Sequence, residues 1–428
     1  MAAFNLSDIE FNEIRYDVYK DLRSKEPVYW YEPMKSWLVM RHDDITKLLR
    51  GNVLSTNFLI EDKLDSKKIK LDDNIIAIRD TIKKWMIYND APEHTRLRKY
   101  MNTAFKKVYI QNVMPNIETI IQSKLESSDI GNEFDFVENF AHPTPALILS
   151  KMFGLDEIDL DTFVSWSDSI ANFMQDFVVS PIPSSTIAKE TAKDLLAMKE
   201  AFQLAIQLRK EKPKNDLLSQ LVKALGNDGS SIDSDDLMLQ LIHLIFGGHK
   251  IPQFVMSNLL HCLLLQPNML QAVLSNTSEL LPSAIAESMR YESPIQFITR
   301  HAREDILLHG KRIKKGDSIY LMLGSANRDE NVFHEPDVFN LNRPLNKHIS
   351  FGSGIHTCIA AAFVKDELEA IFKSFFKGSS SIVVEYNLQS PSWTNNATFH
   401  GILRQPIRIV KFDGSQLQKE EPHYSKIG

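Results

Sequence analysis

Cys358 is the residue whose surroundings most clearly predict chemistry. It ends the segment FGSGIHTC, residues 351–358, which contains two glycines. A metal-binding thiolate needs backbone N–H groups that point at the sulfur, and glycines permit this approach because they lack a Cβ and tolerate positive φ. Residues 359–372 read as a helix, whose positive end favours the thiolate over the thiol. The pattern predicts a metal-ligating cysteine, and the alternative is a buried cysteine on a glycine loop.

The cysteine content indicates a reducing compartment. The chain has 2 cysteines in 428 residues, too few for a disulfide framework. The other one, Cys262, lies in the apolar helical segment LLHCLLLQP and is expected to be a small buried core residue.

Charge and hydropathy exclude several classes of protein. A formal net charge of −6 argues against nucleic acid as the main partner, although scattered basic clusters can still receive an acidic protein. No stretch of about 18 apolar residues is uninterrupted, so no membrane span is expected. The N-terminal segment carries charges every few residues and lacks the apolar core of a signal peptide. We therefore expect a cytoplasmic protein.

Hydrophobic periodicity predicts a mainly helical fold with small β-sheets. Helical patterns cover residues 43–49, 93–105, 117–125, 193–209, 234–265 and 281–291, and strand-like runs cover 27–31, 37–41 and 319–323. No Gly/Ser/Pro linker separates two halves, so residues 1–412 are expected to form a single domain. Residues 413–428 are polar and are expected to form a loose C-terminal tail.

The cysteine segment resembles the haem-binding loop of cytochromes P-450, whose pattern is Phe-Gly-x-Gly-x-His-x-Cys-x-Gly. The matching residues are Phe351, Gly352, Gly354, His356 and Cys358. Ala360 stands where the family usually has glycine, and Val364-Lys365 replace the usual Ala-Arg; alanine adds only one methyl group at the close approach. The resemblance implies the helical cytochrome P-450 fold and a haem b cofactor whose iron is bound by Cys358.

A second family motif lies upstream of the cysteine. Glu287 and Arg290 are three residues apart and share one helix face. They match the Glu-x-x-Arg motif, and the segment EPDVFNLNRP matches a family segment in which Arg343 completes a Glu–Arg–Arg cluster. The resemblance implies a structural cluster that pins the haem-side loop.

Four basic residues match the positions that hold the haem propionates in the family. His94 and Arg98 are four apart and so face the same way on the helix that begins near Pro92. Arg300 and His356 match the other propionate contacts. The resemblance implies that these four residues bind the cofactor.

The sequence departs from the family in the long helix expected over the distal haem face. Most relatives carry an acid–alcohol pair there, which helps to deliver protons. With Gly248 aligned, Lys250 takes the place of the acid and Ile251 that of the alcohol. Pro252 cannot donate to the carbonyl of Gly248 and is expected to kink the helix, so that this carbonyl is free to hold a water.

This departure leaves several routes for protons open. The protons come from ordered water, from a substrate hydroxyl, or from His249 or Lys250. Alternatively, the enzyme uses peroxide or catalyses coupling, rearrangement or dehydration. A helix kink with no catalytic meaning for Lys250 is equally compatible with the sequence.

The resemblance also suggests a substrate class and partners. The substrate-pocket candidates are Trp85, Leu244, Ile295, Phe297, Ile298 and Thr398. They are largely apolar, which suits a medium-to-large hydrophobic natural-product intermediate such as a polyketide, peptide or terpenoid. Lysines 99, 106, 107, 347 and 365 form a candidate basic patch for an acidic ferredoxin or flavodoxin, although a solvated helix face explains them nearly as well.

Three functions are compatible with these motifs. The first is a monomeric tailoring monooxygenase that takes electrons from a redox partner and receives a free or carrier-bound substrate. The second is an atypical haem-thiolate enzyme, and the third is a non-catalytic haem-binding scaffold.

Overall fold

The protein is mainly helical, as the hydrophobic periodicity predicts. A computed structural model describes residues 4–6, 8, 10–57, 72–103, 105, 117–125, 133–155, 158–179, 184–226, 232–377 and 379–411. Its helices are α1 (Phe11–Lys25), α2 (His42–Arg50), α4 (Asp73–Ile82), α5 (Glu93–Met101), α7 (Pro143–Phe153), α8 (Leu160–Val179), α9 (Ser185–Glu211), α10 (Leu217–Ala224), α11 (Ser234–Leu264), α12 (Pro267–Ser275), α13 (Thr277–Tyr291), α14 (Leu323–Ala326) and α15 (Ala361–Phe376). Residues 117–125 are also helical.

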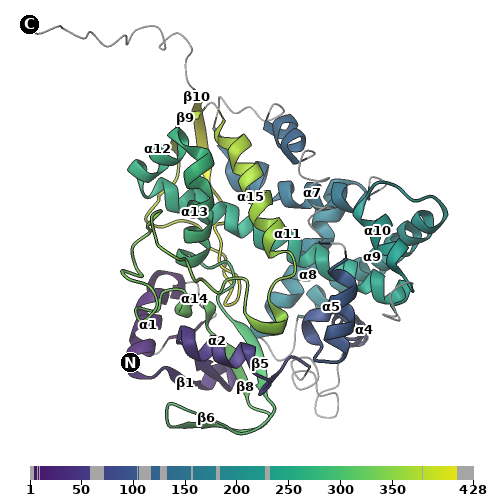
Figure 1. Ribbon diagram of the computed structural model, residues 1–428, viewed down its shortest axis with the longest axis horizontal. Coiled ribbons are helices and arrows are strands. Elements are labelled where there is room, and N and C mark those ends of the chain that lie inside the picture. The colour runs from purple at the N-terminus through teal and green to yellow at the C-terminus, as the bar shows by residue number, and fades with distance from the viewer. Residues whose placement is uncertain are drawn as a thin grey trace, which may run out of the picture.

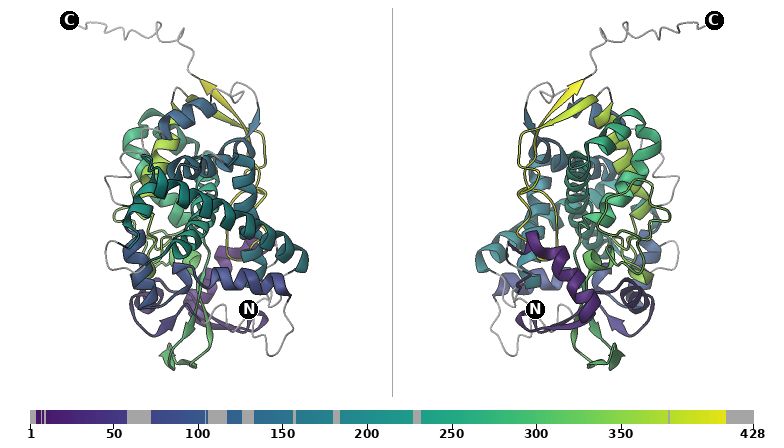
Figure 2. Two further views of the ribbon diagram at one scale, coloured as in Figure 1. Left: turned by 90° about the vertical axis from the view of Figure 1, so that its right-hand side faces the viewer. Right: turned by 90° about the vertical axis from the view of Figure 1, so that its left-hand side faces the viewer.

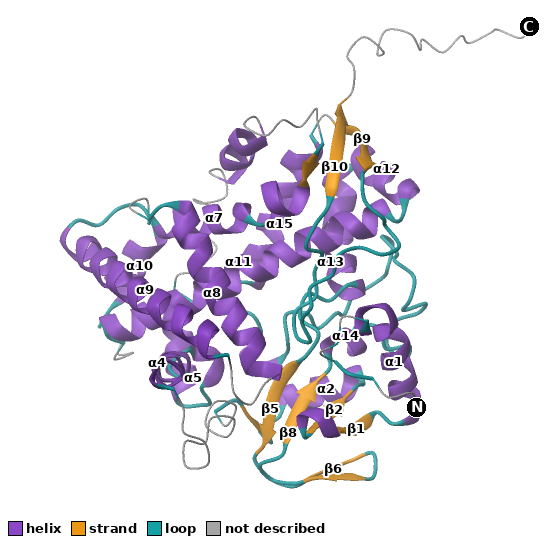
Figure 3. Ribbon diagram, turned by 180° about the vertical axis from the view of Figure 1, so that it is seen from behind, coloured by secondary structure: helices purple, strands orange, loops and turns teal. Residues whose placement is uncertain are grey.

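Among the described residues, three small sheets accompany the helices. The largest has the order β1-β2-β8-β5-β3, a second has the order β4-β10-β9, and β6 pairs with β7. Their bounds are β1 (Val28–Tyr31), β2 (Ser36–Val39), β3 (Leu54–Ser55), β4 (Phe134–Asp135), β5 (Ile298–Ala302), β6 (Ile306–Leu308), β7 (Lys311–Ile313), β8 (Ser318–Leu321), β9 (Ser379–Val384) and β10 (Pro406–Lys411). The first two sheets lie toward opposite ends of the helical body (Figure 3).

Helix α11 runs through the middle of the helical body, with α7, α8, α9 and α13 packed against it (Figures 1 and 2). The Asp233 side chain caps its first turn by accepting from the N–H of Asp236. From Pro252 to Leu264 the side chains of α11 are buried, and most of them are apolar. The helix is continuous through Pro252, so the proline does not end it.

The segments that flank α11 come from distant parts of the chain. Strand β2 pairs in parallel with β8, with Leu38 opposite Tyr320, which places the N-terminal sheet beside the segment after α13. An isolated bridge joins Ile295 to Phe399 and brings the chain near its C-terminus to the same region. These long-range pairings position the site.

Several predicted boundaries shift in the structure. The helix predicted over 193–209 extends to Ser185–Glu211, and the one predicted over 93–105 ends at Met101. Helix α13 begins at Thr277, before Pro282, whereas the periodicity placed its start at residue 281. The single-domain boundary stays a prediction, and the predicted tail, 413–428, lies outside the described residues.

Within the described part of the chain, no helix combines the length and apolar character needed to cross a membrane.

A buried charge network fastens the N-terminal helix to the end of α13. The Glu292 carboxylate accepts from the Tyr16 hydroxyl at 2.8 Å, from His400 Nε2 at 2.9 Å and from Arg328 Nη2 at 3.1 Å. The Arg328 guanidinium also lies over the rings of Tyr16 and Tyr291, at 3.6 and 3.7 Å from their centroids. Burial alone would raise the pKa of Glu292, but His400, Arg328 and Tyr16 outweigh it and lower the pKa to about 2.

This network predicts acid sensitivity. Because the folded pKa of Glu292 lies below its ordinary value of 4.5, its contribution to stability is present above that value and is lost as the pH falls toward about 2. We expect this group to remove about 3 kcal/mol of unfolding free energy over that fall. Denaturant unfolding of Glu292→Gln should show a correspondingly shallower dependence on pH. The matched control Glu279→Gln changes an exposed carboxylate on α13 and should keep the wild-type dependence of stability on pH. A wild-type dependence in Glu292→Gln would contradict the prediction.

Candidate active site

The loop that carries Cys358 is held by tight backbone contacts. Gly352 and Gly354 adopt φ values of 72° and 74°, a left-handed region that suits glycine. The Cys358 N–H donates to the carbonyl of Phe351 at 2.9 Å, and a short 3-10 turn, Gly354–His356, precedes the cysteine. Helix α15 begins at Ala361, directly after the loop. The sulfur therefore lies where the chain enters a helix.

Gly354 permits a close approach between this loop and α2. A Cβ at position 354 would lie 2.2 Å from the carbonyl oxygen of Leu49, which is an impossible contact. Arg50, at the end of α2, donates from Nε to the Ser353 hydroxyl at 3.0 Å. The loop is thus seated on α2, and the second glycine of the motif is required for this packing.

Burial dominates the electrostatics of Cys358. Burial raises the pKa of the thiol, while the N–H of Ala360 and the charge of Arg98 lower it. The net direction is upward, although the N–H of Ala360 at the start of the helix acts in the predicted direction. The reason is that the sulfur is largely removed from water. A cation bound at the sulfur would supply the missing stabilisation.

Four basic side chains gather beside this loop. The rings of His94 and His356 lie 4.1 Å apart, and the Nε2 atom of each is buried without a partner. Arg98 donates to the Thr357 carbonyl at 2.5 Å, and Arg300 donates to the Thr299 carbonyl at 2.8 Å. No carboxylate among the described residues forms an ion pair with either arginine.

The pKa values of these groups reflect burial beside one another. Burial, and then the charges of Arg300, His94 and Arg98, lower the pKa of His356 to about 3. Burial also lowers the pKa of Arg300 to about 10. Desolvated donors without acids are costly, so this cluster suits a ligand that carries carboxylates.

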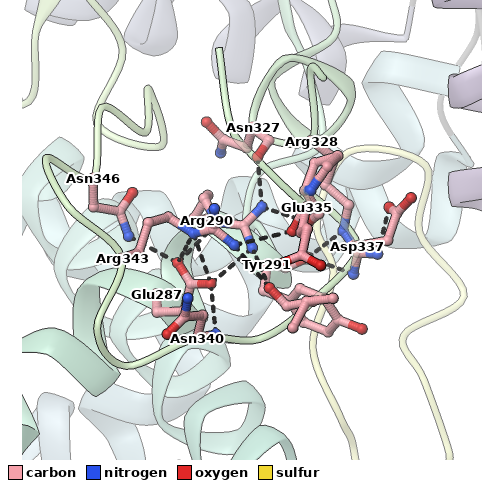
Figure 4. Close-up of polar contacts among 12 residues, drawn as sticks. Glu287, Arg290, Tyr291, Asn327, Arg328, Glu335, Asp337, Asn340, Arg343 and Asn346 are labelled. Carbon is pink, nitrogen blue, oxygen red and sulfur yellow. Dashed lines mark hydrogen bonds and ion pairs between the residues drawn. The ribbon is translucent and has the colours of Figure 1, made fainter. Parts of the chain in front are cut away.

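A shared carboxylate stands upstream of the loop (Figure 4). Glu287 accepts from Nε and Nη2 of Arg290, both at 2.8 Å, and from Nε of Arg343 at 3.0 Å. It also accepts from the Asn346 amide at 3.0 Å and from the Asn340 N–H at 2.9 Å. The three residues of the predicted cluster lie together, and every oxygen of the buried carboxylate is satisfied.

One side of α11 faces open space. No atom lies within 4 Å of a Cβ built on Gly247, and this glycine is exposed although it lies in the middle of a central helix. Leu244 and Ile251 are half-buried and share its side of the helix, since they are three residues before it and four after it. We call Leu244, Gly247 and Ile251 the open side of α11. Gly248 instead packs on α7, where a Cβ would lie 3.0 Å from Leu149.

His249 and Lys250 contact other helices. His249 is fully buried, and its Nε2 lies 2.7 Å from the carbonyl oxygen of His142. Lys250 forms an ion pair with Asp168 of α8 at 2.6 Å. Of the four distal candidates, Ile251 is the one on the open side, and Gly248, His249 and Lys250 are engaged with α7 and α8.

Aromatic side chains stand next to the open side. Trp85 stacks on His243 of α11 at 5.1 Å and on Phe246 at 6.1 Å, and Phe246 meets Phe399 at 6.0 Å. Ile295 pairs with Phe399 through the bridge described above, and Ile298 and Thr398 are half-buried nearby in sequence.

Phe297 departs from the predicted pocket. Its ring stacks on Tyr320 at 4.7 Å and belongs to the N-terminal hydrophobic cluster with Leu38 and Met40. Neighbouring residues of an extended segment point in opposite directions, so Phe297 faces the core beside α1.

Comparison with known proteins decides the family. A family model for cytochrome P-450 matches residues 31–378. The chain belongs to the cytochrome P-450 family. It is 29% identical over 409 residues to the polyketide biosynthesis cytochrome P-450 PksS of Bacillus subtilis (strain 168), covering 94% of this chain and 97% of that protein.

Solved structures of cytochromes P-450 share the fold. The structure of PksS from the bacillaene polyketide synthase superimposes with a TM-score of 0.83 at 28% identity, covering 96% of this chain and 100% of that one. A P-450BioI in complex with an acyl carrier protein bearing hexadec-9Z-enoic acid gives a TM-score of 0.84 at 24% identity, covering 95% and 100%. The predicted fold class is confirmed.

Family membership settles the general chemistry. Cytochromes P-450 are haem-iron monooxygenase oxidoreductases, so the expectation of an oxidoreductase enzyme is confirmed, and no observation favours a non-catalytic scaffold. The residues present fit this cofactor. A half-buried cysteine on a glycine loop can meet an iron, and buried donors beside it that have no partner among the described residues can meet the two acids of a haem.

Sequence reasoning missed three side chains on or near the distal helix: His142, Asp168 and His243. His243 lies four residues before Gly247, so the helical period could have placed it beside the open side. No local signal pointed to Asp168 or His142, because both residues are far from α11 in the sequence and contact it only in the folded protein. In the basic patch, Lys365 lies 5.5 Å from the Phe351 ring centroid, and Lys106 and Lys107 fall outside the described residues.

Two glycines of equal φ allow a test of the close packing between the cysteine loop and α2. Gly354 and Gly310 both have φ 74°, but no atom lies within 4 Å of a Cβ on Gly310. Alanine at either position carries a strain of about 1–2 kcal/mol. We expect Gly354→Ala to lose roughly 1–3 kcal/mol more of unfolding free energy, because the added methyl group overpacks against α2. The displaced loop should then retain haem about tenfold more weakly. Equal haem retention in both variants, measured by haem transfer to an acceptor protein, would contradict the close approach.

Proposed function

We propose that Cys358 is the thiolate ligand of a haem b iron and that His94, Arg98, Arg300 and His356 hold the haem propionates. The observation that carries this proposal is a set of basic groups directly beside the cysteine loop whose buried donors have no acid partner within the described part of the chain. A thiolate-bound haem supplies oxygen activation, because the thiolate pushes electron density that favours O–O cleavage. Phe351, Gly352 and Ala360 then form the cradle around the sulfur.

The chain's own residues would divide the remaining work. The Ala360 N–H donates toward the Cys358 sulfur and tunes the metal. The Glu287–Arg290–Arg343 cluster holds the segment that leads into the loop. Ser350 supports this holding role, since its hydroxyl donates to the Met289 carbonyl of α13 at 2.7 Å.

The reaction is proposed to be monooxygenation of a medium-to-large hydrophobic natural-product intermediate. The apolar and aromatic side chains beside the open side of α11 suit such a molecule, with Trp85, Leu244, Ile295, Ile298 and Thr398 as contacts. Polyketide biosynthesis, named for PksS, makes a polyketide the first class to examine. The enzyme is proposed to be a cytoplasmic monomer that takes electrons from a ferredoxin or flavodoxin, with a substrate that is free or carried by an acyl carrier protein.

The thiolate assignment has a direct spectroscopic test. The reduced carbon monoxide complex of the wild-type protein should show the red-shifted Soret band of a sulfur-bound iron. Cys358→Ser should lose this band, because an alcohol ionises far less readily than a thiol and is a much weaker ligand. Oxygen-dependent turnover should fall by several orders of magnitude. The control Cys262→Ser changes a buried cysteine on α11 and should keep the band. A red-shifted band in Cys358→Ser would overturn the assignment.

A second candidate function is an atypical haem-thiolate reaction, such as a peroxide-driven oxidation, coupling, rearrangement or dehydration. The absence of the acid–alcohol pair at Lys250 and Ile251 favours it. Pro252 has no N–H to give to the carbonyl of Gly248, so this carbonyl is available to hold a water. Such a water would instead serve the first candidate, because it would take over the proton delivery that the family's alcohol assists.

Ile251→Thr separates the two candidates. If proton delivery limits an oxygen-dependent reaction, restoring a hydroxyl on the open side should raise coupled turnover by roughly 10²-fold or less, the lower range of a positioned proton donor. The measurement compares oxygen consumed with product formed. Ile251→Val, which keeps the branched shape without a hydroxyl, is the control. Equal coupling in wild type, Ile251→Thr and Ile251→Val would show that this position does not govern proton delivery.

A further inference from the structure

Three side chains surround Lys250. Its ammonium lies 2.6 Å from Asp168 Oδ1, 3.2 Å from Gln253 Oε1 and 3.4 Å from His142 Nε2. The two oxygens accept from the ammonium. The side chain is mostly buried, with 14% of its surface exposed. Lys250 is therefore held in place by a shielded ion pair and a hydrogen bond.

The two histidines complete the cluster. His142 Nε2 lies 3.2 Å from Asp168 Oδ2, and the His142 ring stacks on the ring of His249 at 5.0 Å. Burial, and then the charges of Lys250 and His142, lower the pKa of His249 to about 3, so this ring is neutral near pH 7. Burial raises the pKa of Asp168, but His142 and Lys250 outweigh it and lower the pKa to about 2. The pair at the centre is thus a lysine cation and an aspartate anion.

The cluster has the chemistry of a metal site but already contains a cation. Ligand atoms of His142, Asp168 and His249 lie within 4.8 Å of one another. A divalent ion among them would stand next to the Lys250 ammonium, and two cations a few ångströms apart repel strongly in a partly buried site. Lys250 occupies the role that a metal would otherwise have.

The polarity of this ion pair is the reverse of the family pattern described above. There the acid belongs to the distal helix; here the distal helix provides the lysine, and Asp168 of α8 provides the acid. Helices α8 and α11 pack against each other (Figure 1). Apolar residues of α8 such as Phe163 and Ile170 belong to the core. The ion pair adds a directional contact to this apolar packing.

We propose that Lys250 and Asp168 form a latch that fixes α8 against α11, and that Lys250 is a positioning residue. The latch rests on the proposed function in one respect, because it takes the open side of α11 as the place where substrate binds. Lys250 lies three residues after Gly247 and one before Ile251, so a shift of α8 along this pair changes access to that side. His142 supports the latch from the start of α7.

Charge reversal tests the latch. Lys250→Met and Asp168→Asn each remove one partner, whereas Lys250→Glu and Asp168→Lys each create a pair of like charges. The double variant Lys250→Glu/Asp168→Lys restores opposite charges. In the haem-loaded full chain, hydrogen exchange of residues 160–174 should become about tenfold faster in each single variant. The double variant should recover most of the wild-type protection.

A ligand-binding measurement adds a second readout. With 4-phenylimidazole as the probe, association with the haem iron should also become about tenfold faster in the four single variants and return toward wild type in the double variant. The matched control is Asp236→Asn, which breaks the 2.9 Å pair between Arg96 of α5 and the first turn of α11. It should leave exchange in 160–174 unchanged.

Three outcomes would overturn the latch: wild-type exchange in the single variants, no recovery in the double variant, or one zinc ion per chain retained by the wild type and lost in His142→Ala. The exchange readout does not depend on the iron ligand. A wild-type protein without the red-shifted Soret band would therefore overturn the Cys358 assignment while leaving the latch to be judged on exchange alone.

Discussion

The site depends on a single buried carboxylate, Glu287, that two arginines share. Arg343 and Asn346 bring the segment after β8 onto α13, and Arg290 binds the carbonyls of Asn327, Pro336 and Val338 from the other side. Removing one member of such a group leaves an unpaired buried charge, which costs roughly 3–5 kcal/mol. Glu287, Arg290 and Arg343 therefore act as one unit, which we call the clasp: removing any one of them destabilises the contacts of the other two.

This clasp is continuous with the cysteine loop. Asn327 donates to the Ser350 hydroxyl at 2.8 Å and accepts from the Ile349 N–H at 2.8 Å, so the chain is pinned to within two residues of the glycine turn. From there Gly354 seats the loop on α2, and Cys358 enters α15. A sulfur ligand needs this stiffness, because small displacements of a ligand weaken a metal bond and alter its tuning.

Several buried charges elsewhere in the fold form ion pairs. Arg328 meets Glu292, Arg209 meets Asp216 at 2.6 Å, and Lys250 meets Asp168. Beside Cys358, by contrast, the buried donors of His94, Arg300 and His356 have no acid partner among the described residues. A protein tolerates such a cluster where a ligand supplies the opposite charge, which is the physical reason for assigning the propionates there.

The family resemblance implied the place of Arg343 in the carboxylate cluster. Local pattern in the sequence determined the helical class, the cysteine loop and the Glu287–Arg290 pair. These features follow from short-range rules: helical period, glycine conformation and residues three or four apart on one helix face. Cys358, Glu287 and Arg290 could be singled out because each lies in a compact motif.

Tertiary structure alone decided which way the distal residues face. The sequence placed Lys250 in the position of the family's acid and left its role open, because a helical residue's direction is set by the helices packed around it. Asp168 and His142 are far from Lys250 in sequence, and only the packing of α7 and α8 on α11 brings their side chains to its ammonium. The same reason explains Phe297, whose ring was assigned to the substrate pocket but packs on Tyr320, since the alternation of an extended segment does not say which face meets which core.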